Sequence, residues 1–241
     1  MSSVIRSKVG QYFNPVGLFY CGTSLFRPSL FLPHFHVPSI NHIYFLNLKK
    51  NGIKYIVFDK DNTLTQPYAK TFHHSVAMAM LECQAVFERG DLAILSNSAG
   101  SSCDKNYAHA REIEKSMDLP VIRHRFKKPH VYEDIIKQFT RDGIEPRNEE
   151  ICVVGDRVFA DIVLGNRHGF LTIQVNGITQ RNENKAVIWS RHVEEGFLKR
   201  LARQKSNPFA PFEELKQQGL YKQVVRKEPN AEFLAVPGST L

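Results

Sequence analysis

The chain has 241 residues, of which 42% are hydrophobic and 23% are charged, and its formal net charge is +8. This composition is typical of a soluble globular protein with one sizeable domain and extensions. No apolar run reaches the roughly 20 residues that a membrane-spanning helix needs. The positive charge suggests an anionic partner, which can be a nucleic acid, a phospholipid surface or a phosphorylated substrate.

The four cysteines are widely scattered, at positions 21, 83, 103 and 152. Because no two of them form a C-x-x-C pair, the sequence gives little support to a zinc site or a thioredoxin-like redox centre. We expect reduced thiols in a reducing compartment.

Residues 1–50 differ from the rest of the chain because they contain no Asp or Glu but several Lys and Arg. The first segment, MSSVIRSKVGQYFN, has the Ser, Arg and Lys content of an organelle transit peptide. The following segment is rich in Phe, Pro and His, and its prolines exclude a long helix. Two compatible interpretations remain: an irregular arm packed over the domain, or a segment that contacts an anionic membrane.

From residue 53 onward, apolar runs alternate with helical periods. The runs at 55–58, 92–96, 121–124, 151–155 and 171–175 are typical of buried strands. The helical spacing of apolar residues predicts helices over 76–87 and 132–139. This alternation indicates an α/β fold with a parallel sheet that helices cover on both faces. After residue 182 the pattern predicts a closing helix, so we place the domain at 51–205 and a tail at 206–241.

Polar residues follow four of the predicted strands, where α/β proteins bind their ligands. The first strand ends in two aspartates one residue apart, and the others end in a Ser-Asn pair, a Lys-Lys pair and a second pair of aspartates. These residues are Asp59, Asp61, Ser96, Asn97, Lys127, Lys128, Asp156 and Asp161.

The order of these residues resembles that of the haloacid-dehalogenase-like (HAD) phosphohydrolases, in the stretches DKDNT, LSN, KKP and GDRVFAD. The resemblance covers about residues 53–176 and implies a Rossmann-like HAD fold. Asp59 is then expected to be the nucleophile that forms an aspartyl-phosphate, and Asp61 the general acid and base. We favour Lys128 over Lys127 as the phosphate-binding lysine because the family's lysine usually precedes proline directly.

The resemblance also implies a magnesium ion. Asp59, Asp156 and the backbone carbonyl of Asp61 would supply hard oxygen ligands for Mg²⁺. Ser96 and Asn97 would bind the phosphate together with the lysine. Asp161 is expected to support the site, by orienting the lysine or a metal-bound water.

The spacing between these motifs leaves no room for a large cap domain. The segment from Asp59 to Ser96 holds about one loop and one helix, and that from Ser96 to Lys128 holds about one helix and one strand. The site is therefore expected to be open, which suits a phosphate carried by a large molecule such as a lipid, a protein or a nucleic acid.

A closer resemblance is to the mitochondrial phosphatidylglycerophosphate phosphatases of fungi and plants, in FDKDNTLT, LSNSAGS, VIRHRFKKP and VVGDRVFADI. It implies a peripheral enzyme on the matrix side of the inner mitochondrial membrane, with a phospholipid substrate in the route to cardiolipin. The alternative is a HAD phosphatase for another large substrate, such as a phosphoprotein or nucleotide. A non-catalytic adaptor and a nucleic-acid-binding protein are less favoured, and the sequence does not give the oligomeric state.

Overall fold

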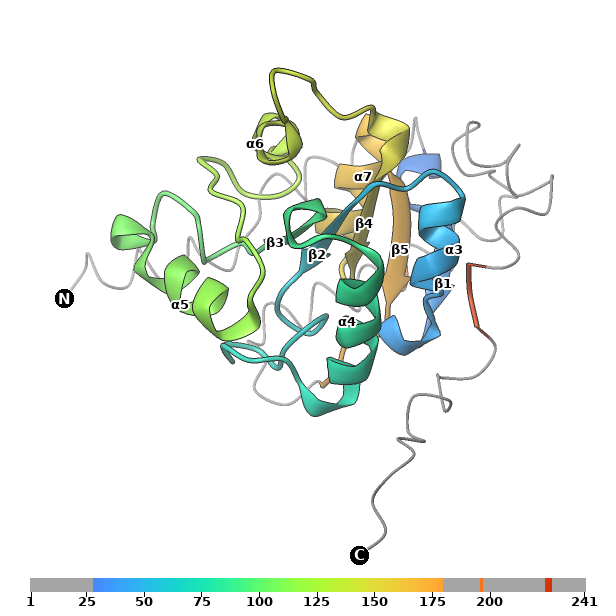
Figure 1. Cartoon of the computed structure of the whole chain (residues 1–241), viewed down its shortest axis with the longest axis horizontal. Coiled ribbons are helices and arrows are strands. Elements are labelled where there is room, and N and C mark those ends of the chain that lie inside the picture. Colours follow the sequence, from blue (N-terminus) through green and yellow to red (C-terminus); the bar gives the residue numbers. More distant parts are fainter. Residues whose placement is uncertain (1–27, 180–195, 197–223, 227–241) are drawn as a thin grey trace, which may run out of the picture.

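The computed structural model describes residues 28–179, 196 and 224–226. Its centre is a five-stranded, fully parallel sheet with the strand order β1-β5-β4-β2-β3 (Figure 1). The strands are β1 (Phe35–Val37), β2 (Tyr55–Asp59), β3 (Leu92–Leu95), β4 (Ile151–Gly155) and β5 (Leu171–Val175).

Helices cover both faces of this sheet. The α-helices are α3 (Phe45–Lys50), α4 (His74–Val86), α5 (Ala108–Met117), α6 (Tyr132–Phe139) and α7 (Val163–His168). Short 3₁₀ helices lie at Pro28–Phe31, Ile40–His42, Arg89–Asp91, Lys105–Tyr107 and Asn148–Glu150, and a π-helical turn spans Val158–Ile162. The predicted α/β fold with a parallel sheet and no large cap domain is confirmed for the described residues.

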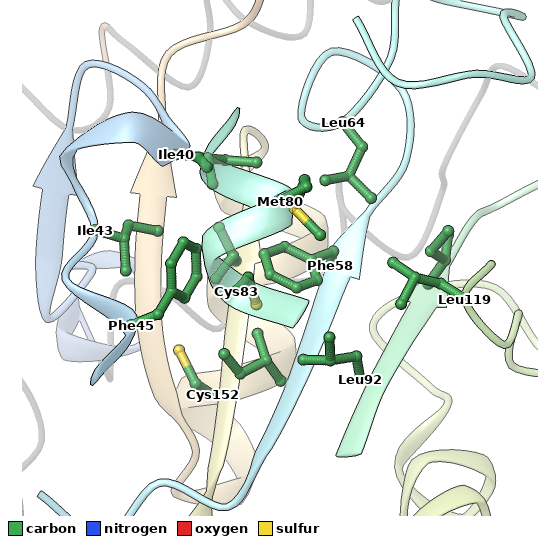
Figure 2. Close-up of a cluster of buried hydrophobic side chains, with 14 of the residues drawn as sticks. Ile40, Ile43, Phe45, Phe58, Leu64, Met80, Cys83, Leu92, Leu119 and Cys152 are labelled. Carbon is green, nitrogen blue, oxygen red and sulfur yellow. The ribbon is translucent and has the colours of Figure 1, made fainter. Parts of the chain in front are cut away.

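Alternation along the strands divides the core into two layers. In β2, Ile56 and Phe58 point into a cluster that contains residues of α3, α4 and α5. Val57, between them, points to the other face, against α6 and α7. Figure 2 shows Phe58 beside Met80 and Cys83 of α4. Because helices cover both faces of the sheet here, β2 is apolar along its length until the strand ends at Asp59.

One predicted strand, 121–124, is reduced to two isolated parallel bridges, between Ile94 and Val121 and between Ser101 and His124. Because β3 ends at Leu95, it offers this segment no further backbone partners with which to extend the sheet. The N–H of His124 donates instead to the carbonyl of Gly100, 2.9 Å away in the loop after β3. The chain therefore leaves the sheet and follows that loop.

The described part of the N-terminal segment belongs to the same fold. β1 pairs in parallel with β5, with Phe35 beside Ile173 and Val37 beside Val175. In α3, Phe45 and Leu48 are fully buried in the cluster that also contains α4, and Figure 2 shows Phe45 in this cluster. The structure thus extends the folded unit at least to residue 28, before the boundary at residue 51 that the sequence analysis placed.

A buried polar network fastens this N-terminal segment to α7 and β5. The side-chain amide of Asn166 donates to the carbonyl oxygens of Leu30 and Leu32, at 3.0 and 2.8 Å. Its carbonyl oxygen accepts from the hydroxyl of Thr172, at 2.9 Å. The N–H of His34 donates to the same hydroxyl, at 3.1 Å. Segments more than 130 residues apart in the sequence are joined in this way.

Other predictions for the two ends of the chain fall partly or wholly outside the described residues. The transit-like segment and the closing helix at 182–205 lie there, apart from residue 196. Of the predicted tail, residues 224–226 are described, and they lie against residues 42–44 through a bridge between Ile43 and Val225. Where the chain is described, no helix has the length and apolar character needed to span a bilayer.

Candidate active site

The strand register places the predicted site residues at one edge of the sheet. Asp59, the last residue of β2, lies beside Leu95, the last residue of β3, so Ser96 follows directly next to it. On the other side Phe58 pairs with Val154 of β4, one residue before Gly155. The carboxyl ends of these three central strands therefore meet, as expected for a parallel sheet.

Three carboxylates gather at this edge. Oxygen atoms of Asp59, Asp156 and Asp161 all lie within 4.8 Å of one another. The three residues are 9%, 3% and 1% exposed, so the charges are almost withdrawn from water. Burial of this kind is unfavourable unless an opposite charge compensates it.

The compensating charge comes from Lys128, which is also buried. Its ammonium group donates to Asp161 Oδ1 at 2.6 Å and to a carboxylate oxygen of Asp59. Of the two lysines that the sequence left open, Lys128 is thus the one seen in contact with the aspartates. Burial opposes the charged form of Lys128, but the carboxylates of Asp161 and Asp59 outweigh burial and raise the pKa of its ammonium group.

Asp161 is more deeply buried than we expected for a residue with only a supporting role. Burial raises the pKa of its carboxyl group above the usual range, and the ammonium group of Lys128 opposes this rise. The N–H of Arg157 donates to Asp161 Oδ2 at 3.2 Å. Gly155 makes room for this side chain, because a Cβ atom at residue 155 would lie 2.4 Å from the Asp161 carboxyl carbon. The glycine of the G-D motif is therefore required by packing.

Ser96 and Asn97 begin the loop after β3. The Ser96 hydroxyl oxygen accepts from the N–H groups of Ser98 and Ala99, both at 3.3 Å, and Ser96 is 1% exposed. The Ser96 hydroxyl oxygen also lies 3.2 Å from the Ser98 hydroxyl oxygen, so three contacts hold it in place. The side-chain oxygen of Asn97 is buried and has no hydrogen-bond partner among the described residues.

His124 connects this loop to the loop that carries Lys128, a role the sequence did not reveal. Its Nε2 lies 2.7 Å from the carbonyl oxygen of Ser96, and its Nδ1 lies 2.5 Å from that of Phe126. Arg123, the residue before this histidine, forms a bidentate ion pair with Glu114, at 2.9 and 2.8 Å. The histidine thus fixes the distance between the serine and the lysine loops.

Asp104 closes the loop after Ser96 onto α5. Its carboxylate accepts from the N–H groups of Gly100, His109 and Ala110, each at 3.0 Å. Burial alone would raise the pKa of Asp104, but these three donors outweigh it and hold the pKa below its usual value.

The side chain of Asp61 lies apart from the three-carboxylate cluster and is 39% exposed. Its Oδ1 accepts from the ammonium group of Lys60 at 2.5 Å and from the N–H of Tyr68 at 3.0 Å. Lys60, between the two aspartates, was not singled out from the sequence. Nothing in the D-x-D pattern marks the middle position, since its burial depends on how the following loop folds.

The donor set of this edge could hold a divalent cation. Three charged carboxylates and one ammonium group would leave a net charge of −2, which the +2 charge of Mg²⁺ would neutralise. Carboxylate oxygens are also the ligands that Mg²⁺ prefers in proteins. The residues present therefore fit this ion, with Asp161 as well as Asp59 and Asp156 close enough to contribute.

Comparison with known proteins places the chain in a family. Residues 18–179 match the family described as "Mitochondrial PGP phosphatase". The chain is 36% identical, over 85% of its length and 58% of the relative's, to phosphatidylglycerophosphate phosphatase 1, chloroplastic/mitochondrial, of Arabidopsis thaliana. It is 37% identical to phosphatidylglycerophosphate phosphatase 1, chloroplastic, of Chlamydomonas reinhardtii, over 80% of this chain and 71% of the relative.

A fungal relative agrees with the two plant and algal proteins. Phosphatidylglycerophosphatase GEP4, mitochondrial, of Saccharomyces cerevisiae is 34% identical over 60% of this chain and 77% of the relative. The family match covers the whole sheet and every site residue described above. The chain belongs to the mitochondrial PGP phosphatase family.

Proposed function

We propose that this protein is a magnesium-dependent phosphatidylglycerophosphate phosphatase, which removes the terminal phosphate monoester to give phosphatidylglycerol. The observation that carries the proposal is the buried cluster of Asp59, Asp156, Asp161 and Lys128 at the carboxyl edge of the sheet. Family membership and the names of the relatives supply the substrate.

In the proposed mechanism, a carboxylate oxygen of Asp59 attacks phosphorus and forms an aspartyl-phosphate. Asp61 protonates the leaving oxygen and then takes a proton from the water that hydrolyses the intermediate. Lys128 keeps Asp59 in place before the reaction and neutralises phosphate charge during it. Ser96 and Asn97 bind phosphate oxygens through their hydroxyl and amide groups.

The bound Mg²⁺ would screen the repulsion between the nucleophile and the phosphate dianion. Its ligands would be Asp59, Asp156 and the backbone carbonyl of Asp61, and Asp161 would orient Lys128. Since phosphoryl transfer depends mainly on positioning and charge neutralisation, the protein needs little other chemistry.

Two exposed aromatic side chains beside the site favour a substrate at a membrane surface. Phe126 is 59% exposed and lies two residues before Lys128, and Tyr68 is 62% exposed and contacts Asp61 through its backbone. The guanidinium group of Arg125 lies 5.6 Å from the Phe126 ring centre. Aromatic and basic side chains together suit the interface of an anionic bilayer. We place the enzyme at the matrix face of the inner mitochondrial membrane, bound peripherally.

A first experiment tests the chemistry. With Mg²⁺ the purified protein should hydrolyse p-nitrophenyl phosphate, chelation should stop the reaction, and Asp59→Asn should lower kcat by at least about 1000-fold. Mg²⁺ should also raise the Tm of the wild-type protein more than that of Asp156→Asn, a readout independent of turnover. Full activity of Asp59→Asn, measured on correctly folded protein, would refute the proposed nucleophile.

A second experiment tests the substrate. Turnover of phosphatidylglycerophosphate in anionic vesicles is compared with that of a phosphopeptide and a nucleoside monophosphate, which represent the alternative substrates. We expect the lipid to have the highest kcat/KM, and a higher value for either soluble phosphate would favour the alternative. Phe126→Ser should lower the rate on vesicles more than Ile144→Ser, which removes an exposed apolar side chain from the loop leading into the amino end of β4.

A further inference from the structure

Lys60 is fully buried although it lies next to the end of β2, between the two aspartates of the D-x-D motif. A lysine rarely loses all contact with water, because removing its charge from solvent is costly. The mechanism proposed above gives Lys60 no role. Its surroundings show what it does.

The ammonium group of Lys60 has three oxygen neighbours, all on the loop that follows it. They are Asp61 Oδ1 at 2.5 Å, the carbonyl oxygen of Ala69 at 3.0 Å and the hydroxyl oxygen of Thr65 at 3.4 Å. The carbonyl oxygen of Lys60 also accepts from the N–H groups of Leu64 and Thr65, each at 3.0 Å. Lys60 therefore binds the loop 61–69 from both its main chain and its side chain.

These contacts act unequally on the two oxygens of Asp61. Both hydrogen bonds that the described residues make to this carboxylate end on Oδ1, one from Lys60 and one from the N–H of Tyr68. Since the side chain is 39% exposed, the second oxygen, Oδ2, is left for the substrate. The carboxyl group is thus held in one orientation.

We propose that Lys60 is a positioning residue that holds Oδ1 of Asp61, so that Oδ2 faces the leaving oxygen of the phosphate ester. The inference rests on the proposed function. As the bond between phosphorus and the leaving oxygen breaks, its electron pair takes the proton from Oδ2, the Oδ2–H bond breaks, and the alcohol leaves neutral. The carboxylate that remains later accepts a proton from the hydrolytic water.

A purely structural role explains Lys60 less well. Well-packed apolar residues often replace a buried ion pair without loss of stability, so such a pair is weak evidence of stabilisation. The partner of Lys60 is moreover the exposed acid of the reaction, whereas the partners of Lys128 are buried. A cation that is buried against a half-exposed carboxylate fixes the direction of that carboxylate.

The test compares two esters of nearly equal shape, p-nitrophenyl phosphate and phenyl phosphate. Nitrophenolate leaves without help, whereas phenolate is more basic and needs the proton. For Lys60→Met we expect kcat/KM to fall about 100-fold on phenyl phosphate but less than about 10-fold on p-nitrophenyl phosphate. The ratio kcat/KM is used because it reports only the steps up to alcohol release, before the hydrolysis that both esters share.

Matched variants keep the test decisive. Lys54→Met removes a lysine from the other end of β2 and should lower neither value appreciably. Lys60→Gln, which keeps an amide donor in the buried position, replaces Lys60→Met if the latter fails to fold. In an Asp61→Asn background, Lys60→Met should cause no further loss on phenyl phosphate, because the group through which it acts is already absent.

The outcomes separate the inference from the function. An equal fall of kcat/KM on both esters, in a folded Lys60 variant, would overturn the positioning role and leave the proposed function standing. A wild-type protein that hydrolyses neither ester with Mg²⁺ would overturn the proposed function, and the inference with it.

Discussion

The two ends of the parallel sheet carry ion pairs that differ in the exposure of the cation, which is buried at the carboxyl end and exposed at the amino end, where its partner Glu150 is buried. At the carboxyl end, the side chains of Lys128 and Asp161 are each 1% exposed where they meet. At the amino end, the side chain of Lys54 is 61% exposed and pairs with Glu150 at 2.9 Å. Glu150 is shared there with Arg147, whose side chain is 70% exposed.

This contrast shows where the fold accepts an energetic cost. An ion pair whose cation stays in water costs less to form and contributes less to stability, whereas pairs buried on both sides are tolerated only in full mutual contact. Substituting the ion pair at the amino end is therefore expected to change stability little. At the carboxyl end, the charged side chains are already held in contact with one another. Its three carboxylates and one lysine are expected to respond as a unit to any single change.

The largest expected effect comes from Lys128→Met. It leaves Asp59 and Asp161 buried without their cation, so we expect the free energy of unfolding to fall by about 3–5 kcal/mol in the presence of a chelator. The loss of a phosphate-binding charge should lower kcat by about 100-fold or more. Denaturant unfolding and steady-state kinetics measure the two effects. Lys127→Met is the control, and equal effects of both variants would contradict the assignment.

An intermediate effect is expected at Asp104, which is only partly buried at the carboxyl end. Asp104→Ala removes an acceptor of three N–H groups and should lower the free energy of unfolding by about 1–3 kcal/mol at neutral pH. Folding lowers the pKa of this carboxyl group, so its contribution is present above the ordinary Asp pKa and is lost as the pH falls through the folded value.

The difference between the wild-type protein and Asp104→Ala should accordingly shrink when unfolding is measured below about pH 4. Asp104→Asn keeps one oxygen acceptor and should lie between the two at neutral pH. A difference that grows on acidification would show that the carboxylate is not the group that caps α5.

The smallest effect is expected at the amino end. Lys54→Ala should lower the free energy of unfolding by less than about 1 kcal/mol, because Glu150 keeps its contact with Arg147 at 2.7 Å. Denaturant unfolding at low and at high salt measures this change. A loss comparable with that of Lys128→Met would remove the distinction between the two ends of the sheet.

Much of the fold followed from two periodicities in the sequence. The apolar runs gave four of the five strands, and helical spacing gave α4 and α6. The convergence of the strand ends then followed from parallel topology alone, which is why Asp59, Ser96 and Asp156 could be placed on one edge before their contacts were known.

The elements that the sequence did not reveal depend on partners distant in the chain. β1 is three residues long between prolines, too short for an alternating pattern, and it exists because β5 pairs with it. Lys60 and His124 carry no local signal, because their contacts lie in neighbouring loops. The sequence predicted only a supporting role for Asp161, because the spacing of residues along the chain does not show how deeply a side chain is buried.

The attachment of residues 29–32 to Asn166 sets a limit on proteolytic maturation of this chain. A cut that removed only the residues before 28 would leave the contacts between residues 28–179 in place. A cut after residue 37 would take away β1, the present edge strand of three residues, and expose the main chain of β5, an edge of five residues that could pair with other molecules. A mature N-terminus is therefore expected before Pro28, and mass spectrometry of the native protein can locate it.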